Sequence, residues 1–271
     1  MQDAAVEQRE VDRIGVVIAS VLLTYALTRL VQSPQFILSL DLPGFYFSYP
    51  LSLSTAMTVL ATGLAATGMD WLLHSHPGLA KKSTIEHWML PALTTLVIGL
   101  PLALLPEGSA WWIGFGIGGI LVTFVFLAEY TVVVPSAPYY GLARAGLTAL
   151  SYALFLILVT ALRLAAMRLF LLVPVIAIAA GLISLRILHL DGTDRWDFSW
   201  AVGIGLICTQ IGAGLHYWPL SPIQYGLALV GPLYALTSLS INLAENIPLR
   251  RAAMGSLVLL GAAWIGAAIL R

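Results

Sequence analysis

Long apolar runs separated by short polar joints dominate the hydropathy pattern of this chain. Nine runs are long enough to cross a bilayer as helices, because about 20 apolar residues span a hydrocarbon core of roughly 30 Å. The pattern therefore predicts an all-α integral membrane protein, a single bundle of about nine transmembrane helices. The predicted spans cover approximately residues 13–32, 50–73, 87–105, 109–133, 142–163, 166–188, 199–217, 222–244 and 250–270.

The chain shows no domain boundary, low-complexity tract or internal repeat, so we expect one polytopic membrane domain over residues 1–271. Residues 1–12 form a short polar segment of mixed charge. This segment is too acidic for the start of a signal peptide, and no cleavage site follows the first apolar run. We therefore expect the first span to be retained.

Composition excludes several protein classes. The chain is 59% hydrophobic and 10% charged, with a mean hydropathy of +0.92, whereas a soluble domain carries about a quarter charged residues. Soluble, disordered and fibrous classes are excluded, and the lipid bilayer is the expected partner. The net charge is zero and no basic run is present, so no nucleic acid is expected to bind. The single cysteine, Cys208, excludes a disulfide within one chain.

The distribution of basic residues predicts the orientation in the membrane. With the N-terminus cytoplasmic and the C-terminus outside, nine of the thirteen Lys and Arg residues face the cytoplasm. Trp and Tyr residues form belts at both ends of the spans, as expected at membrane interfaces. The expected location is a bacterial cytoplasmic (inner) membrane. The aromatic joint 33–49 is predicted either to lie on the outer interface or to re-enter the membrane.

The predicted bilayer midplane contains no ionisable residue. Ion-coupled carriers usually place a charge there, so a pump or proton-coupled carrier is disfavoured. The polar side chains predicted at depth include Gln210 and Asn242, with Ser238 nearby on the same span as Asn242. The Gly231-Pro232 pair in that span predicts either a kink accommodated by packing or a broken helix beside a solute path.

Ionisable residues gather at the predicted cytoplasmic ends of the spans. The first cluster combines Asp70, His74, His87 and Glu129. Asp70 and His74 are four residues apart and share one helical face. Three interpretations stay open: ordinary interfacial residues, a zinc, iron or haem-like site, and a proton-handling or catalytic site.

The second cluster is the joint between the sixth and seventh spans. It carries Asp191, Asp194 and Asp197 at a regular spacing of three residues. Aspartates at this spacing can bind Mg²⁺ and, through it, a diphosphate. The alternative is a hydrophilic turn that caps the seventh span.

The fourth span contains a GxxxG pair, Gly114 and Gly118. Such a pair lets two helix backbones approach closely. We interpret it as a packing face within the chain, with a homodimer through the same face as the alternative.

The layout also resembles that of the UbiA-type membrane prenyltransferases, with nine spans and acidic cytoplasmic joints between spans 2 and 3 and spans 6 and 7. This resemblance implies a Mg²⁺-prenyl diphosphate held between the two joints. Here the first motif is reduced to Asp70 followed by His74. The residues that the resemblance assigns to Mg²⁺ are Asp70, Asp191, Asp194 and Asp197, and those that it assigns to the diphosphate are Lys81, Lys82 and Arg144.

Three functional hypotheses follow from the sequence. The first is a non-enzymatic accessory or scaffold subunit of a membrane complex, which leaves open whether it holds lipid or pigment and which other membrane subunits it contacts. It rests on the charge-free midplane and the absence of a complete catalytic motif. The second is the Mg²⁺-dependent UbiA-like prenyltransferase. The third is a facilitator for a neutral or amphipathic solute, with Gln210, Asn242 and Ser238 along its path.

Overall fold

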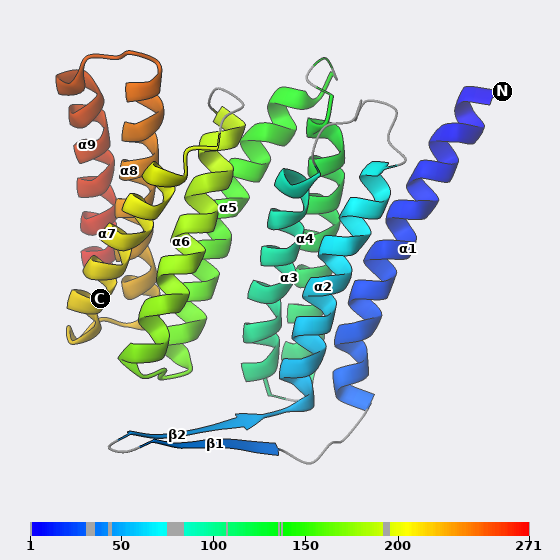
Figure 1. Ribbon diagram of the computed structural model, residues 1–271, viewed down its shortest axis with the longest axis horizontal. Helices are drawn as coiled ribbons and strands as arrows, with labels where there is room; N and C mark the ends of the chain where they lie inside the picture. Colours follow the sequence, from blue (N-terminus) through cyan, green and yellow to red (C-terminus); the bar gives the residue numbers. More distant parts are fainter. Residues whose placement is uncertain are drawn as a thin grey trace. The chain divides into compact units, whose positions relative to one another are not determined.

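The chain divides into two compact units, residues 1–140 and 141–271, in the computed structural model. Each unit is described by itself (Figure 1). The structure describes residues 2–30, 36–42, 45–74, 84–106, 108–134, 136, 138–191 and 196–270. Within these ranges, the side chains of residues 2–11, 29–30, 36–42, 45–51 and 191 are not described. The predicted single domain over 1–271 stays a prediction.

The first unit contains four helices and one β-hairpin. Helix α2 packs against α1 and α3, and α4 packs against α3 and α1. Buried apolar side chains of α1, α2 and α4 meet in its core, among them Val21, Ala65 and Phe126. The elements are α1 (Gln2–Leu30), β1 (Phe36–Leu42), β2 (Phe45–Leu51), α2 (Leu53–His74), α3 (Ile85–Leu104) and α4 (Ser109–Val132).

The joint that we predicted as an interfacial or re-entrant segment forms this hairpin. Strands β1 and β2 pair antiparallel, with Phe36 opposite Leu51 and Leu42 opposite Phe45. The pairing lets each strand satisfy one edge of its backbone hydrogen-bonding groups. The hairpin adds a two-stranded element to the predicted helical bundle.

The second unit contains five helices. Helix α6 packs against α7, α8 packs against α9, and both α6 and α7 contact α8 (Figure 1). Helix α8 begins with a capping box, in which the Ser221 hydroxyl accepts from the Gln224 N–H and the Gln224 side chain accepts from the Ser221 N–H. The helices are α5 (Tyr140–Leu164), α6 (Leu169–Asp191), α7 (Phe198–His216), α8 (Pro222–Ala244) and α9 (Leu249–Ile269).

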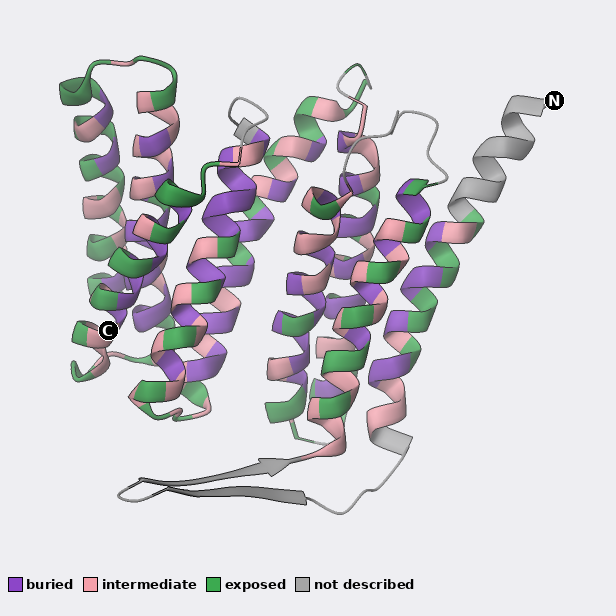
Figure 2. Ribbon diagram, in the orientation of Figure 1, coloured by how far each residue is buried: buried purple, intermediate pink, exposed green. Residues whose placement is uncertain are grey.

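The prediction of a multi-pass helical membrane protein is confirmed. Among the described residues, eight helices, α2 to α9, are long and apolar enough to cross a membrane. These helices expose many large apolar side chains, as lipid-facing surfaces do, and Figure 2 shows exposed residues alternating with buried ones along them. The predicted first span, 13–32, overlaps α1, whose side chains are described only from 12 to 28. A count of nine spans and the N-inside orientation stay predictions.

Glycines bring helices of the first unit close together. A Cβ atom added at Gly118 would lie 2.7 Å from Ile98 of α3, and one added at Gly114 would lie 2.8 Å from Leu105, directly after α3. The GxxxG pair therefore faces the α3 segment of the same chain, as the packing interpretation expects. Homodimerisation stays a prediction.

In the second unit, the backbones of α6 and α7 approach each other closely at a glycine. A Cβ atom added at Gly205 would lie 2.9 Å from the carbonyl oxygen of Ala177 and 3.3 Å from the backbone nitrogen of Gly181. Polar side chains also join the helices, because the Trp264 indole donates to the Ala228 carbonyl at 3.1 Å and the Tyr225 hydroxyl donates to the Gly212 carbonyl at 2.8 Å. Small residues and interhelical hydrogen bonds thus hold neighbouring helices of this unit together.

Helix α8 continues through Gly231 and Pro232. Pro232 is buried, and a Cβ atom at Gly231 would lie 2.8 Å from Ala263 of α9. The glycine therefore allows a close approach of α9. This arrangement agrees with a proline accommodated by packing, in which neighbouring helices stabilise the residues around the missing hydrogen bond.

We predict that Gly205→Ala lowers the free energy of unfolding by about 1–3 kcal/mol, because the new methyl group meets backbone atoms that cannot rotate away. Gly203→Ala is the matched control on the same helix, since a Cβ atom there has no neighbour within 4 Å. The control should leave stability unchanged or raise it by up to about 1 kcal/mol through helix propensity. Unfolding in detergent measures both changes, and equal changes in the two variants would contradict the close α6–α7 approach.

Candidate functional site

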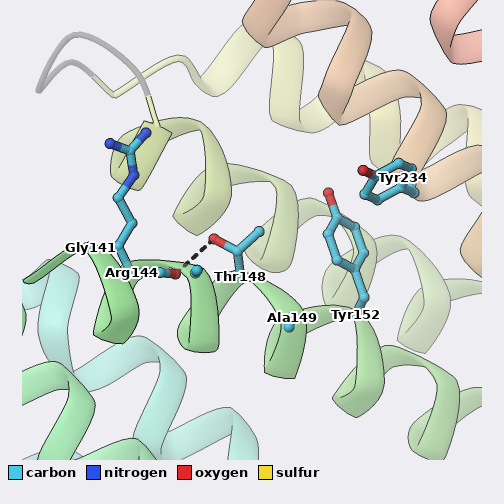
Figure 3. Close-up of a pocket in the computed structure, with 7 residues that line it drawn as sticks. Gly141, Arg144, Thr148, Ala149, Tyr152 and Tyr234 are labelled. Atoms are coloured by element: carbon cyan, nitrogen blue, oxygen red, sulfur yellow. Dashed lines mark hydrogen bonds between the residues drawn. The ribbon is translucent and has the colours of Figure 1, made fainter. Parts of the chain in front are cut away.

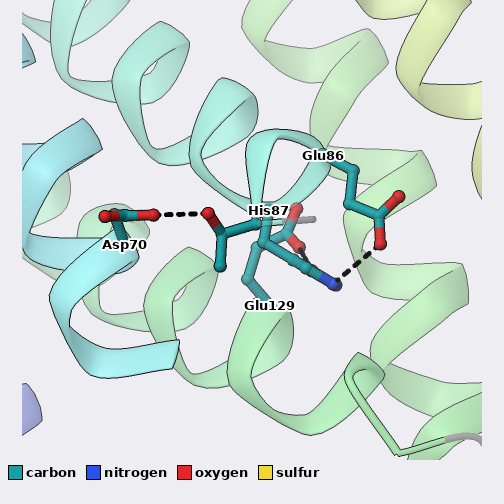
Figure 4. Close-up of polar contacts among 5 residues, drawn as sticks. Asp70, Glu86, His87 and Glu129 are labelled. Carbon is teal, nitrogen blue, oxygen red and sulfur yellow. Dashed lines mark hydrogen bonds and ion pairs between the residues drawn. The ribbon is translucent and has the colours of Figure 1, made fainter. Parts of the chain in front are cut away.

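A buried histidine joins α3 to α4 in the first unit. The Nδ1 atom of His87 lies 2.8 Å from Glu129 Oε2, and its Nε2 atom lies 3.3 Å from Glu86 Oε1 (Figure 4). The His87 and Glu129 side chains are 7% and 0% exposed. Two residues of the first predicted cluster therefore come together across 42 positions of sequence.

The contacts of His87 limit where protons can lie on its imidazole ring and on the two neighbouring carboxyl groups. A neutral imidazole carries one N–H group, whereas both ring nitrogens of His87 face a carboxylate oxygen. Both contacts are hydrogen bonds only if the ring is an imidazolium or one carboxyl group carries a proton. The arrangement can therefore hold one proton more than a neutral histidine beside two carboxylates.

The other two residues of this cluster lie at the end of α2. The Thr84 hydroxyl donates to Asp70 Oδ1 (Figure 4). The His74 Nδ1 atom lies 2.8 Å from the Asp70 carbonyl oxygen and 3.5 Å from Asp70 Oδ2. The His74 and Asp70 side chains are 67% and 43% exposed, so this pair lies in a far more exposed environment than His87 and Glu129.

Among the side chains that the structure describes, no group of three or more His, Cys, Asp or Glu residues is arranged to hold a metal ion. Lys81 and Lys82 lie outside the described residues. Of the predicted acidic loop, Asp194 and the Asp191 side chain also lie outside them. Asp197 precedes α7 and lines a cavity of about 170 Å³ together with Trp200 and residues of α8.

A second cavity of about 450 Å³ lies along α5. Two rows of α5 residues, each with a spacing of four, line it with Tyr234 of α8 (Figure 3). Such residues stack on one face of a helix. The first row is small, Gly141, Ala145 and Ala149, and the second is polar, Arg144, Thr148 and Tyr152. We call this cavity the α5/α8 groove.

Hydrogen bonds and ring contacts order the tyrosines of the α5/α8 groove. The Tyr152 hydroxyl lies 2.6 Å from the Thr237 hydroxyl of α8. Its ring meets the Tyr234 ring edge-to-face, with centroids 5.0 Å apart (Figure 3). The Thr148 hydroxyl donates to the Arg144 carbonyl at 3.1 Å. The groove thus has an apolar floor, ordered hydroxyl groups and one cation near the start of α5.

The residues of the predicted solute path occupy different environments. Gln210 is exposed on α7, whereas Ser238 and Asn242 are half-buried on α8. Of these three, the two on α8 are four residues apart and so lie about one helical turn from each other. A solute path through all three residues stays a prediction.

Two arginines have surroundings that the sequence did not predict. Arg186 of α6 is 1% exposed, although it is one of the nine basic residues that the predicted orientation places on the cytoplasmic side. A buried guanidinium is unfavourable unless it is paired. The position of this arginine inside an apolar run was the sequence signal that could have indicated a buried, paired side chain. At the opposite end of the unit, Arg163 Nη1 lies 3.2 Å from His216 Nδ1, and the guanidinium stacks 5.2 Å from the Tyr225 ring centroid.

Comparison with known proteins gives a family assignment. The model of the family described as "Protein of unknown function (DUF5656)" matches residues 32–270. The chain belongs to this family. No curated protein and no solved structure matches the chain. The matched residues include the His87–Glu129 pair and the whole α5/α8 groove.

We predict that His87→Ala lowers the free energy of unfolding by about 3–5 kcal/mol, because it leaves the Glu129 carboxyl group buried without its imidazole partner. A double-mutant cycle with Glu129→Ala should show a coupling energy of at least about 0.5 kcal/mol. His74→Ala is the control, because loss of an exposed pair costs less than about 1 kcal/mol. An equal loss in His87→Ala and His74→Ala would contradict a buried pair.

Proposed function

We propose that this protein is a non-catalytic accessory or scaffold subunit of a membrane complex in a bacterial cytoplasmic membrane. We propose further that it binds an anionic lipid in the α5/α8 groove. The observation that carries the proposal is the position of Arg144, the one basic residue among those lining this groove. In the predicted N-inside orientation, the start of α5 lies at the cytoplasmic interface, where lipid headgroups are found.

Electrostatics at the start of α5 favour an anion. The first turn of α5 contains no acidic residue, and the free N–H groups of a helix N-terminus carry a partial positive charge. Arg144, which already has an interaction partner in the chain, places a guanidinium at this end of the helix, and a guanidinium can bind a phosphate through hydrogen bonds from its several N–H groups. Both charges therefore favour a phosphate headgroup at the same end of the groove.

The rest of the groove suits an acyl or isoprenoid chain. Gly141, Ala145 and Ala149 leave a shallow apolar floor along two turns of α5. Tyr152 and Tyr234 line the groove further along α5 and pack edge-to-face against each other, and the polar tips of tyrosines are compatible with a glycerol or ester group. A cation at one end and an apolar floor behind it match the division of a lipid into head and tail.

We predict that the protein retains phosphatidylglycerol in preference to phosphatidylcholine with the same acyl chains. Arg144→Gln should weaken retention of the anionic lipid about tenfold, because a hydrogen bond to a charged group contributes about 1.5 kcal/mol or more. Arg250→Gln is the control, because Arg250 is exposed on α9 and does not line the groove. Mass spectrometry of the intact protein released from mixed-lipid nanodiscs measures the bound lipid.

Equal retention of the two lipids, or equal losses in Arg144→Gln and Arg250→Gln, would contradict the proposal. A prenyl diphosphate offers the same phosphate chemistry, so it forms a second arm of the experiment. Mg²⁺-dependent consumption of that compound, abolished by Asp191→Asn or Asp194→Asn, would favour the UbiA-like prenyltransferase over a non-catalytic subunit.

A further inference from the structure

A second groove, of about 350 Å³, lies between α6 and α7. Its walls include the exposed side chains of Ile178, Val202 and Leu206. These side chains are exposed on the surface of the unit, and α7 packs against α6 (Figure 1). We call this surface the α6/α7 face.

Gln210 lies on the α6/α7 face, one helical turn beyond Leu206. It is exposed, and its amide makes no hydrogen bond with any residue that the structure describes. At 1.5 Å per residue, Gln210 is roughly 9 Å along α7 from His216, within the apolar part of the span. Hydrocarbon offers no hydrogen-bond partner to an amide at this depth, so an unpaired side chain there is unfavourable.

The geometry points to a second copy of this chain as the partner of the α6/α7 face. A glutamine amide has both a donor group and an acceptor oxygen, so two Gln210 side chains related by a twofold axis can satisfy each other. The exposed side chains of Val202 and Leu206 line the same face in both copies and can enter the groove of the opposite copy. Interhelical hydrogen bonds between side-chain amides contribute to helix association in membranes.

This interface differs from the predicted Gly114/Gly118 face, which packs against the α3 segment of its own chain. It is also independent of the α5/α8 groove, because the residues that line the two grooves do not overlap. The loss of lipid binding would therefore not remove the basis for dimerisation.

We predict that the purified full-length protein dimerises in lipid bilayers and that Gln210→Leu weakens the dimer by about 3- to 10-fold, the range expected for one interhelical polar contact. Single-molecule subunit counting over a series of protein-to-lipid ratios measures the equilibrium. Val258→Leu is the control, because Val258 is exposed on α9 and does not line the groove between α6 and α7. It should leave the equilibrium unchanged.

Oxidative cross-linking locates the interface. In a Cys208→Ala background, Leu206→Cys should form a covalent dimer, and Val258→Cys should not. If the Cys208→Ala background fails to fold, the counting experiment still tests the proposal. A monomer at every ratio, an unchanged equilibrium in Gln210→Leu, or a Val258→Cys dimer without a Leu206→Cys dimer would overturn it. Burial of Gln210 by the first unit of the same chain would give the monomeric result.

Discussion

The hydrocarbon core cannot hydrogen-bond to the chain, and the rest of the structure depends on this constraint. Each long apolar run becomes a helix, because only a helix pairs its backbone groups within a single span. Hydroxyl side chains follow the same rule, since Thr94 bonds to the Leu90 carbonyl and Thr209 to the Gly205 carbonyl, each one turn back. Ionisable groups that enter the bundles need partners, as His87 and Glu129 illustrate.

Packing of small residues decides which helices become neighbours. Lipid and leucine are about equally apolar, so helices associate through close contact and polar bonds rather than through hydrophobicity. Gly118 leaves room for the Ile98 side chain, and Gly205 lets the backbone of α7 lie close to the backbone of α6. The same property shapes the α5/α8 groove, where Gly141, Ala145 and Ala149 leave space that larger residues would fill. The α5/α8 groove therefore forms beside a row of small residues.

The helices were predictable from the sequence because their length and apolarity follow from the bilayer. The predicted span 87–105 corresponds to α3 (Ile85–Leu104), and 199–217 to α7 (Phe198–His216). The hairpin was missed, although Pro43-Gly44 is a typical turn dipeptide between its two strands. Hydropathy placed His87 and Glu129 at one rim, but their contact depends on how α3 packs against α4. The α5/α8 groove likewise depends on helix neighbours that no local pattern encodes.

The lipid proposal unites these features, because one cation lies at the end of an apolar groove that small residues keep open. Electron cryo-microscopy of the protein in nanodiscs containing phosphatidylglycerol tests it most directly. We predict headgroup density within hydrogen-bonding distance of the Arg144 guanidinium and a chain that follows Ala145 and Ala149. A groove filled by another part of the protein, or ordered lipid elsewhere with none beside Arg144, would contradict the proposal.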